Sequence, residues 1–177
     1  SLDEAQCMAV SGFGFLSLKP YLLVVNSGEG GSGINTGELS ESTGTEALAC
    51  KALNELEILQ LPPADQEVFL EEYGIERLSR ESIISSAYRT AGRISFFTAG
   101  EKEVRAWTIR DGTVAVDAAG EIHSDIARGF IRAEVVSYDD YVACDGIKGA
   151  REKGVFRLEG KTYPMADGDV VEFRFSV

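Results

Sequence analysis

The chain has 177 residues, a formal net charge of −12 and 44% hydrophobic residues, which is typical of one globular domain or two small ones. No apolar run approaches the roughly 20 residues needed to span a bilayer, and the negative charge argues against a general nucleic-acid binder and against DNA specificity. Cys7, Cys50 and Cys144 are far apart and form no C-x-x-C pair, as expected of reduced thiols in a cytoplasmic protein.

The charge is distributed unevenly between the two halves. Residues 1–90 hold 5 Lys and Arg against 14 Asp and Glu, whereas residues 91–177 hold 12 against 15. A basic surface is therefore expected in the second half of the chain.

The first half begins with an apolar run at 21–25, which predicts a strand buried on both faces, as in parallel sheets. The stretch 27–44 is rich in Gly, Ser and Thr and predicts a mobile loop. A second short buried strand is expected at 46–50.

Three helices are then expected, at 51–58, 64–73 and from Ser79 or Ser82 onward. Pro62 and Pro63 separate the first two, while glycines close the second and third. Because two strands do not form a stable sheet alone, residues 1–92 predict the end of a larger α/β domain.

The second half reads as a hairpin, a helix and three more strands. Strands at 94–98 and 103–109 flank an Ala-Gly turn. Residues 113–128 are expected to be helical, in two pieces with Ser124 starting the second, and Gly129 to end them in a left-handed conformation. A strand at 130–138 should alternate strictly between its two faces.

Residues 139–153 are expected to be mostly connection, followed by strands at 155–158 and 170–175 with a turn at 167–169. This order predicts an α+β fold of the β-grasp, ubiquitin-like type. The prediction requires one shared hydrophobic centre formed by Val104, Ile122, Ile131 and Phe173.

Several stretches of the second half resemble the C-terminal part of the YchF/Obg-like ATPases, which are P-loop NTPases. They are 97–108, 122–125 with 128–135, and 157–161 with 167–175. They look like the family's TGS domain, and the likeness is close over 79–177 and looser over 12–78. The resemblance implies the end of a P-loop NTPase domain at 1–92 and a TGS domain at 93–177.

In the looser half, residues 19–29 resemble the family's base-specificity motif, Asn-x-x-Glu. The resemblance implies that Asn26 contacts the base edge. Glu29 would replace the Asp that in ordinary GTPases accepts hydrogen bonds from the guanine N1 and N2 groups, so that the family favours ATP or accepts both nucleotides. Residues 49–51 resemble a second base-contact loop, in which Cys50 and Lys51 line the base.

The chain contains no Gly-x-x-x-x-Gly-Lys-Ser/Thr loop to cradle a triphosphate. The resemblance therefore implies a C-terminal fragment of a parent that binds and hydrolyses ATP or GTP with Mg²⁺. Base contacts without phosphate contacts hold a nucleotide weakly, so none is expected to bind this fragment alone, which is predicted to be inactive.

Basic residues of the second half are the candidates for binding RNA or the ribosome. They are Arg105, Arg110, Arg128, Arg132, Lys148, Arg151 and Lys153. Contacts to phosphates would make this binding sensitive to salt. Arg132 and Glu134 share a strand face, so part of the charge is expected to be neutralised within the protein.

No catalytic residue and no metal site are predicted. His123 is the only histidine, and its neighbours Ser124 and Asp125 would point away from it on a helix. The acidic residues Asp139, Asp140 and Asp145 lack the spacing of an EF-hand and predict a solvated connection.

Three hypotheses follow. The first is a fragment of a ribosome-associated, YchF-like nucleotide hydrolase that binds nucleotide only in its full-length form. The second is a non-enzymatic RNA- or protein-binding TGS module with an N-terminal scaffold. The third is a protein-interaction adaptor without a nucleotide role. A P-loop encoded in frame upstream of Ser1 would favour the first.

Overall fold

The computed structural model describes residues 3–28, 33–75, 77–100 and 103–176. The chain divides into two compact units, Ser1–Ala91 (unit 1) and Gly92–Val177 (unit 2). The sequence-based boundary falls one residue later. In the described parts of the chain, no helix has the length and apolar character needed to cross a membrane.

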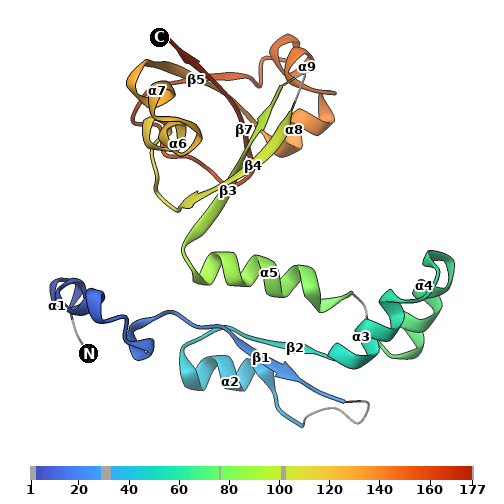
Figure 1. Cartoon of the computed structure of the whole chain (residues 1–177). Helices are drawn as coiled ribbons and strands as arrows, with labels where there is room; N and C mark the ends of the chain where they lie inside the picture. Colours follow the sequence, from blue (N-terminus) through green and yellow to red (C-terminus); the bar gives the residue numbers. More distant parts are fainter. Residues whose placement is uncertain (1–2, 29–32, 76, 101–102, 177) are drawn as a thin grey trace. The chain divides into compact units, whose positions relative to one another are not determined.

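Unit 1 consists of short helices and a two-stranded parallel sheet (Figure 1). Its elements are α1 (Glu4–Val10), η1 (Ser11–Phe13), η2 (Leu16–Leu18), β1 (Leu23–Asn26), α2 (Thr36–Thr43), β2 (Ala47–Cys50), α3 (Ala52–Leu59), α4 (Pro63–Glu72) and α5 (Ser79–Thr90). Both predicted strands and the three predicted helices are present, whereas α1 and α2 were not expected.

The loop prediction is wrong for α2. Asn35 caps this helix, because its Oδ1 accepts hydrogen bonds from the N–H groups of Gly37 at 2.9 Å and Glu38 at 3.3 Å. Gly44 ends it in a left-handed conformation with φ of 66°. A short polar helix of this kind depends on its caps rather than on an apolar face.

Strand β1 is only half buried, so the prediction of burial on both faces is wrong. Leu23 and Val25 are partly covered, and Val24 is 43% exposed. A two-stranded sheet has few neighbours to cover its faces, so the apolar run produces a strand without a closed core around it.

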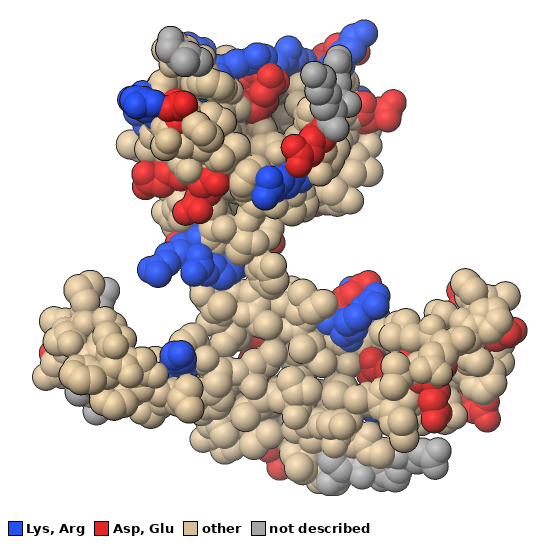
Figure 2. Space-filling model, in the orientation of Figure 1, with Lys and Arg blue, Asp and Glu red and all other residues tan. Residues whose placement is uncertain are grey.

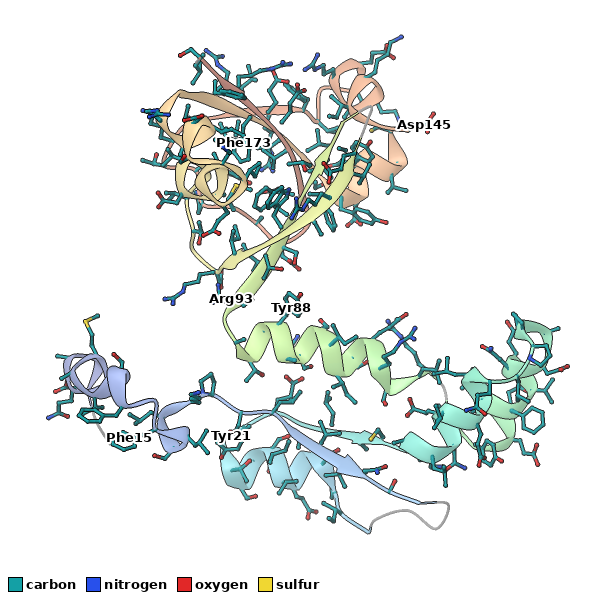
Figure 3. The ribbon with its side chains drawn as sticks, in the orientation of Figure 1. Phe15, Tyr21, Tyr88, Arg93, Asp145 and Phe173 are labelled. Carbon is teal, nitrogen blue, oxygen red and sulfur yellow. The ribbon has the colours of Figure 1, made fainter. Side chains whose placement is uncertain are left out.

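Apolar side chains before β1 are also exposed. They include Met8, Phe13, Phe15, Leu16 and Tyr21. The rings of Phe13 and Phe15 stack on each other with centroids 5.5 Å apart, and Figure 3 labels Phe15 and Tyr21 along this segment.

Unit 2 is built on a five-stranded mixed sheet. Its elements are β3 (Arg93–Ala99), β4 (Val104–Arg110), α6 (Ala115–Ile122), α7 (Ser124–Arg128), β5 (Phe130–Ser137), α8 (Tyr138–Ala143), α9 (Ile147–Glu152), β6 (Arg157–Glu159) and β7 (Asp169–Phe175). The strand order is β4-β3-β7-β5-β6, with β3 parallel to β7 and the other pairs antiparallel. This sheet is consistent with the predicted TGS domain.

Helices α6 and α7 lie on one side of the sheet, and α8 and α9 lie on the other (Figure 1). The main core is formed between the sheet and α6; it includes Phe96, Ala118, Phe130, Val171 and Phe173. Ile122 of α6 and Ile126 of α7 pack against this core. The predicted two-piece helix is confirmed, because the second piece, α7, begins at Ser124.

Two residues expected in this core are not in it. Val104 is 73% exposed and Ile131 is 54% exposed. Val104 lies on edge strand β4, on the opposite face from buried Ile109. Ile131 lies at a β-bulge between Phe130 and Arg132, where the register with β7 shifts. The required shared centre therefore contains Ile122 and Phe173 only.

The same bulge breaks the predicted strict alternation of β5. It places Phe130 in the core together with Ala133 and Val135. Strict alternation would have placed Phe130 on the opposite face of the strand from these two residues. Gly129, before the bulge, has φ of −89°, so the predicted left-handed conformation is wrong.

Most of residues 139–153 form two short helices rather than connecting loop. Ser137 caps α8 by accepting from the N–H of Asp140 at 3.1 Å, and α8 and α9 enclose a second small core of Val136, Cys144 and Ala150. Asp145, between these helices, is exposed and points away from the sheet (Figure 3).

Candidate nucleotide-contacting and RNA-contacting surfaces

In unit 1, the predicted base-contact residues meet where β1 and β2 end. Asn26 and Cys50 are opposite each other in the parallel pair, and the carboxyl ends of parallel strands are where α/β sheets bind ligands. The Oδ1 of Asn26 accepts from the N–H of Ala52 at 3.2 Å and lies 3.8 Å from the Cys50 Sγ. Among the described residues its Nδ2 has no acceptor, and Asn26 is exposed.

Two contacts hold the chain just after Asn26. The N–H and the Oγ of Ser27 both donate to the carbonyl oxygen of Cys50, at 2.9 and 3.3 Å. Glu29, the other residue of the predicted motif, lies outside the described residues.

The ammonium group of Lys51 is bound by another part of unit 1. Its Nζ donates to the carbonyl oxygen of Tyr73 at 2.7 Å, at the end of α4, and its N–H donates to Glu55 at 3.3 Å. Glu55 is buried and also accepts from the N–H and Oγ of Ser79, at 2.8 and 2.9 Å. Only the aliphatic stem of Lys51 is therefore left to line a ligand.

In unit 2, three of the seven predicted RNA-contacting residues are engaged by protein oxygens. Arg128 pairs with Asp125, Arg151 pairs with Glu134 at 2.6 Å, and the Nζ of Lys153 donates to a main-chain carbonyl at 3.1 Å. The charges of the two arginines are therefore paired with carboxylates in the folded protein, whereas the Lys153 ammonium group is bound by an uncharged oxygen.

The other four predicted residues are exposed and, within the described parts of the chain, have no carboxylate partner. They are Arg105, Arg110, Arg132 and Lys148. The guanidinium of Arg105 stacks over the ring of Trp107, 4.1 Å from its centroid. Figure 2 shows Lys and Arg side chains along the upper rim of unit 2, mixed with acidic ones.

Glu134 is neutralised by partners that the sequence analysis did not assign. Arg174 donates two hydrogen bonds to its carboxylate, both at 3.0 Å, and Arg151 donates a third. The hydrogen bond from Arg174 lowers the pKa of the Glu134 carboxyl, with the charges of both arginines adding to it. Among the described residues no hydrogen bond or ion pair joins Arg132 to Glu134, and the register of β5 and β7 places Arg132 opposite Arg174.

His123 has a structural role. Its Nδ1 accepts from the N–H of Asp125 at 3.1 Å and so caps α7. The described residues contain no group of three or more His, Cys, Asp or Glu that would hold a metal ion.

A described family matches the second half of the sequence, and similar proteins align with the whole of it. Residues 93–176 match the family model YchF-GTPase_C, described as a protein of unknown function (DUF933). The chain is 41% identical to the ribosome-binding ATPase YchF of Haemophilus ducreyi, covering 100% of this chain and 50% of that protein. It is 42% identical to the protein of the same name from Bacillus subtilis, covering 98% and 50%.

The structure of the Schizosaccharomyces pombe YchF GTPase has the same fold, with a TM-score of 0.82 and 25% identity over 98% of this chain and 48% of that one. The chain thus spans about half the length of the relatives it matches. It corresponds to the C-terminal half of the YchF proteins that it matches.

Proposed function

We propose that unit 2 is the RNA- and ribosome-contacting module of a cytoplasmic YchF-type protein. The observation that carries this proposal is the set of four exposed basic residues without carboxylate partners among the described residues, on a chain whose net charge is −12. Unneutralised basic groups on an acidic protein indicate a local anionic partner. The similar YchF proteins are named ribosome-binding, which favours RNA as that partner.

Co-sedimentation of the chain with ribosomes at increasing salt tests this proposal. We expect Arg132→Glu to weaken binding at low salt and Arg128→Glu to weaken it less, because Asp125 already neutralises Arg128. Arg77→Glu, just before α5 in unit 1, is the control for the change in net charge. Unchanged binding of Arg132→Glu would show that Arg132 is not part of the RNA-contacting surface.

The same assay with isolated ribosomal RNA separates the two hypotheses for unit 2. Binding to RNA alone, reduced in Arg132→Glu, supports RNA contact. Binding to intact ribosomes without any binding to RNA would favour a protein-binding module, with unit 1 as its scaffold.

For unit 1, we infer that the edge formed by Asn26, Cys50 and Lys51 supplies base-side contacts of a nucleotide site. The Asn26 Nδ2 fits this role, because an amide donor suits the N7 acceptor that adenine and guanine share. It does not distinguish the two bases. The phosphate cradle and the Mg²⁺ ligands would come from residues outside this sequence.

An ATPase assay in Mg²⁺ tests this division of the site. We expect the 177-residue chain to release no phosphate above the blank, because it contains no P-loop sequence. Measurable turnover that disappears in Asn26→Ala would show a complete site within the chain and would contradict the proposal.

A further inference from the structure

The face of the unit 2 sheet opposite α6 carries a compact group of charged side chains. Arg132 and Glu134 of β5 lie opposite Arg174 and Glu172 of β7 in the antiparallel register. Arg151 joins them from α9 through its contact with Glu134. These five residues are called the arginine cluster below.

Glu134 is at the centre of the cluster. Its side chain is 12% exposed and is contacted by Arg174 through both carboxylate oxygens, at 3.0 Å each, and by Arg151 at 2.6 Å. Arg174 also pairs with Glu172 at 3.1 Å. This fork-shaped contact is the geometry in which a guanidinium also binds a phosphate group.

Arg132 has no such partner. It lies directly across from Arg174, and like charges opposite each other on two strands destabilise the pairing. No carboxylate among the described residues pairs with Arg132, which is exposed. The cluster holds three arginines and two glutamates, so it keeps one positive charge, and an added anion at Arg132 would relieve the repulsion.

We propose that the arginine cluster is the phosphate-contacting part of the RNA surface of unit 2, and that Glu134 limits its affinity by occupying Arg151 and Arg174. This rests on the proposed function of unit 2. In the free protein, the guanidinium of Arg132 is available to contact a phosphate. Glu134 takes the place of a second phosphate and competes with the RNA backbone for the other two guanidinium groups.

The substitution Glu134→Gln tests this competition because it keeps the size of the side chain and removes its charge. We expect it to tighten binding to a ribosomal RNA oligonucleotide at low salt and to steepen the dependence of log K on log salt by about 1 for each arginine that then contacts a phosphate. Glu81→Gln on α5, where Glu81 forms an exposed ion pair with Arg77, changes net charge equally and is the matched control.

Arg132→Gln provides a second test that does not disturb a contact within the protein. We expect weaker binding and a salt dependence shallower by about 1. Thermal melts of both variants check that the fold is intact, and this second variant decides the proposal if Glu134→Gln does not fold.

The outcomes separate this inference from the proposed function. If the unmodified chain binds RNA but Glu134→Gln binds no more tightly than Glu81→Gln, the competition by Glu134 is refuted while RNA binding stands. If the chain and both variants bind intact ribosomes but no RNA, both proposals fail and the partner is a ribosomal protein.

Discussion

Gly129 joins α7 to β5 where two main-chain segments lie very close together. A Cβ atom at Gly129 would lie 1.9 Å from the carbonyl oxygen of Ser176, whose N–H donates to the Gly129 carbonyl oxygen at 2.9 Å. We expect Gly129→Ala to lower the free energy of unfolding of unit 2 by about 1–3 kcal/mol, because the backbone must shift. Urea unfolding followed by the fluorescence of Trp107, the only tryptophan, measures this loss.

Gly160→Ala is the matched control for this substitution. A Cβ atom at Gly160 meets nothing within 4 Å, so a change within about 0.5 kcal/mol is expected. Equal losses in the two variants would contradict the steric explanation.

Glu134 makes the stability of unit 2 depend on pH in the acidic range. Its carboxyl has a pKa below the usual 4.5 in the folded state because Arg174 and Arg151 favour the charged form. A group whose folded-state pKa is lowered stabilises the fold fully above its unfolded pKa, and this contribution is lost as the pH falls through the folded value. Below pH 4.5, the urea midpoint reported by Trp107 should therefore fall more steeply in the unmodified chain than in Glu134→Gln.

The role of single residues was predictable from the sequence only where it depends on nearby positions. Ser124 was expected to begin a helix, and α7 starts there. The partners of Glu134 were not predictable, because Arg174 is 40 positions away and comes beside it only through the register of β5 and β7. The charge pattern of β5 alone suggested Arg132 instead.

Among the helices of unit 1, α3 and α5 are joined at their starts by one carboxylate. Glu55 is 7% exposed and accepts from Lys51 at the start of α3 and from Ser79 at the start of α5. Glu55→Ala should lower the free energy of unfolding of unit 1 by about 1–3 kcal/mol, because two partly buried N–H groups lose their acceptor. Urea unfolding followed by far-ultraviolet circular dichroism measures this.

Glu57→Ala on the same helix serves as the control, because Glu57 is exposed. Its effect on unfolding should be small. If both substitutions destabilise the helices equally, the effect arises from the helix itself and not from the contact with Ser79.

Elements with a strong apolar pattern were predictable, and elements held by caps were not. The alternating residues of β5 and β7 indicated strands at nearly the observed positions. Helix α2 has no buried residue and depends on Asn35 and Gly44, so its sequence looks like a loop when only hydrophobic period is considered. Asn35 followed by Glu38 was the signal available for this helix.

The two units of the whole molecule differ in how much apolar surface they bury. The buried hydrophobic residues of the described part of unit 1 are Ala47, Cys50 and Ile58, and the remainder belong to unit 2. We expect two unfolding transitions in urea, with unit 1 unfolding first, because a two-stranded sheet with a small core is marginally stable.

Trp107 reports unit 2, while far-ultraviolet circular dichroism reports the helices of both units. The dichroism signal should therefore begin to change at lower urea than the fluorescence. Superimposable curves would show that the 177-residue chain unfolds as one cooperative body and would contradict this expectation.

The overall organisation was predictable at the level of the family and of the succession of strands and helices along unit 2, because the quoted motifs of the second half are long and the residue patterns mark its strands. The burial of β1 was not, since an apolar run such as 21–25 predicts a closed core only if neighbouring strands exist to cover it.

The exposed aromatic and aliphatic side chains ahead of β1, among them Phe13, Phe15 and Leu16, also govern how concentrated solutions of this chain behave. At low ionic strength, mutual repulsion between molecules of charge −12 keeps these exposed apolar surfaces apart. Added electrolyte weakens that repulsion and leaves the attraction between apolar groups in place. Light scattering should therefore rise with ionic strength, and titrations are best performed on dilute samples.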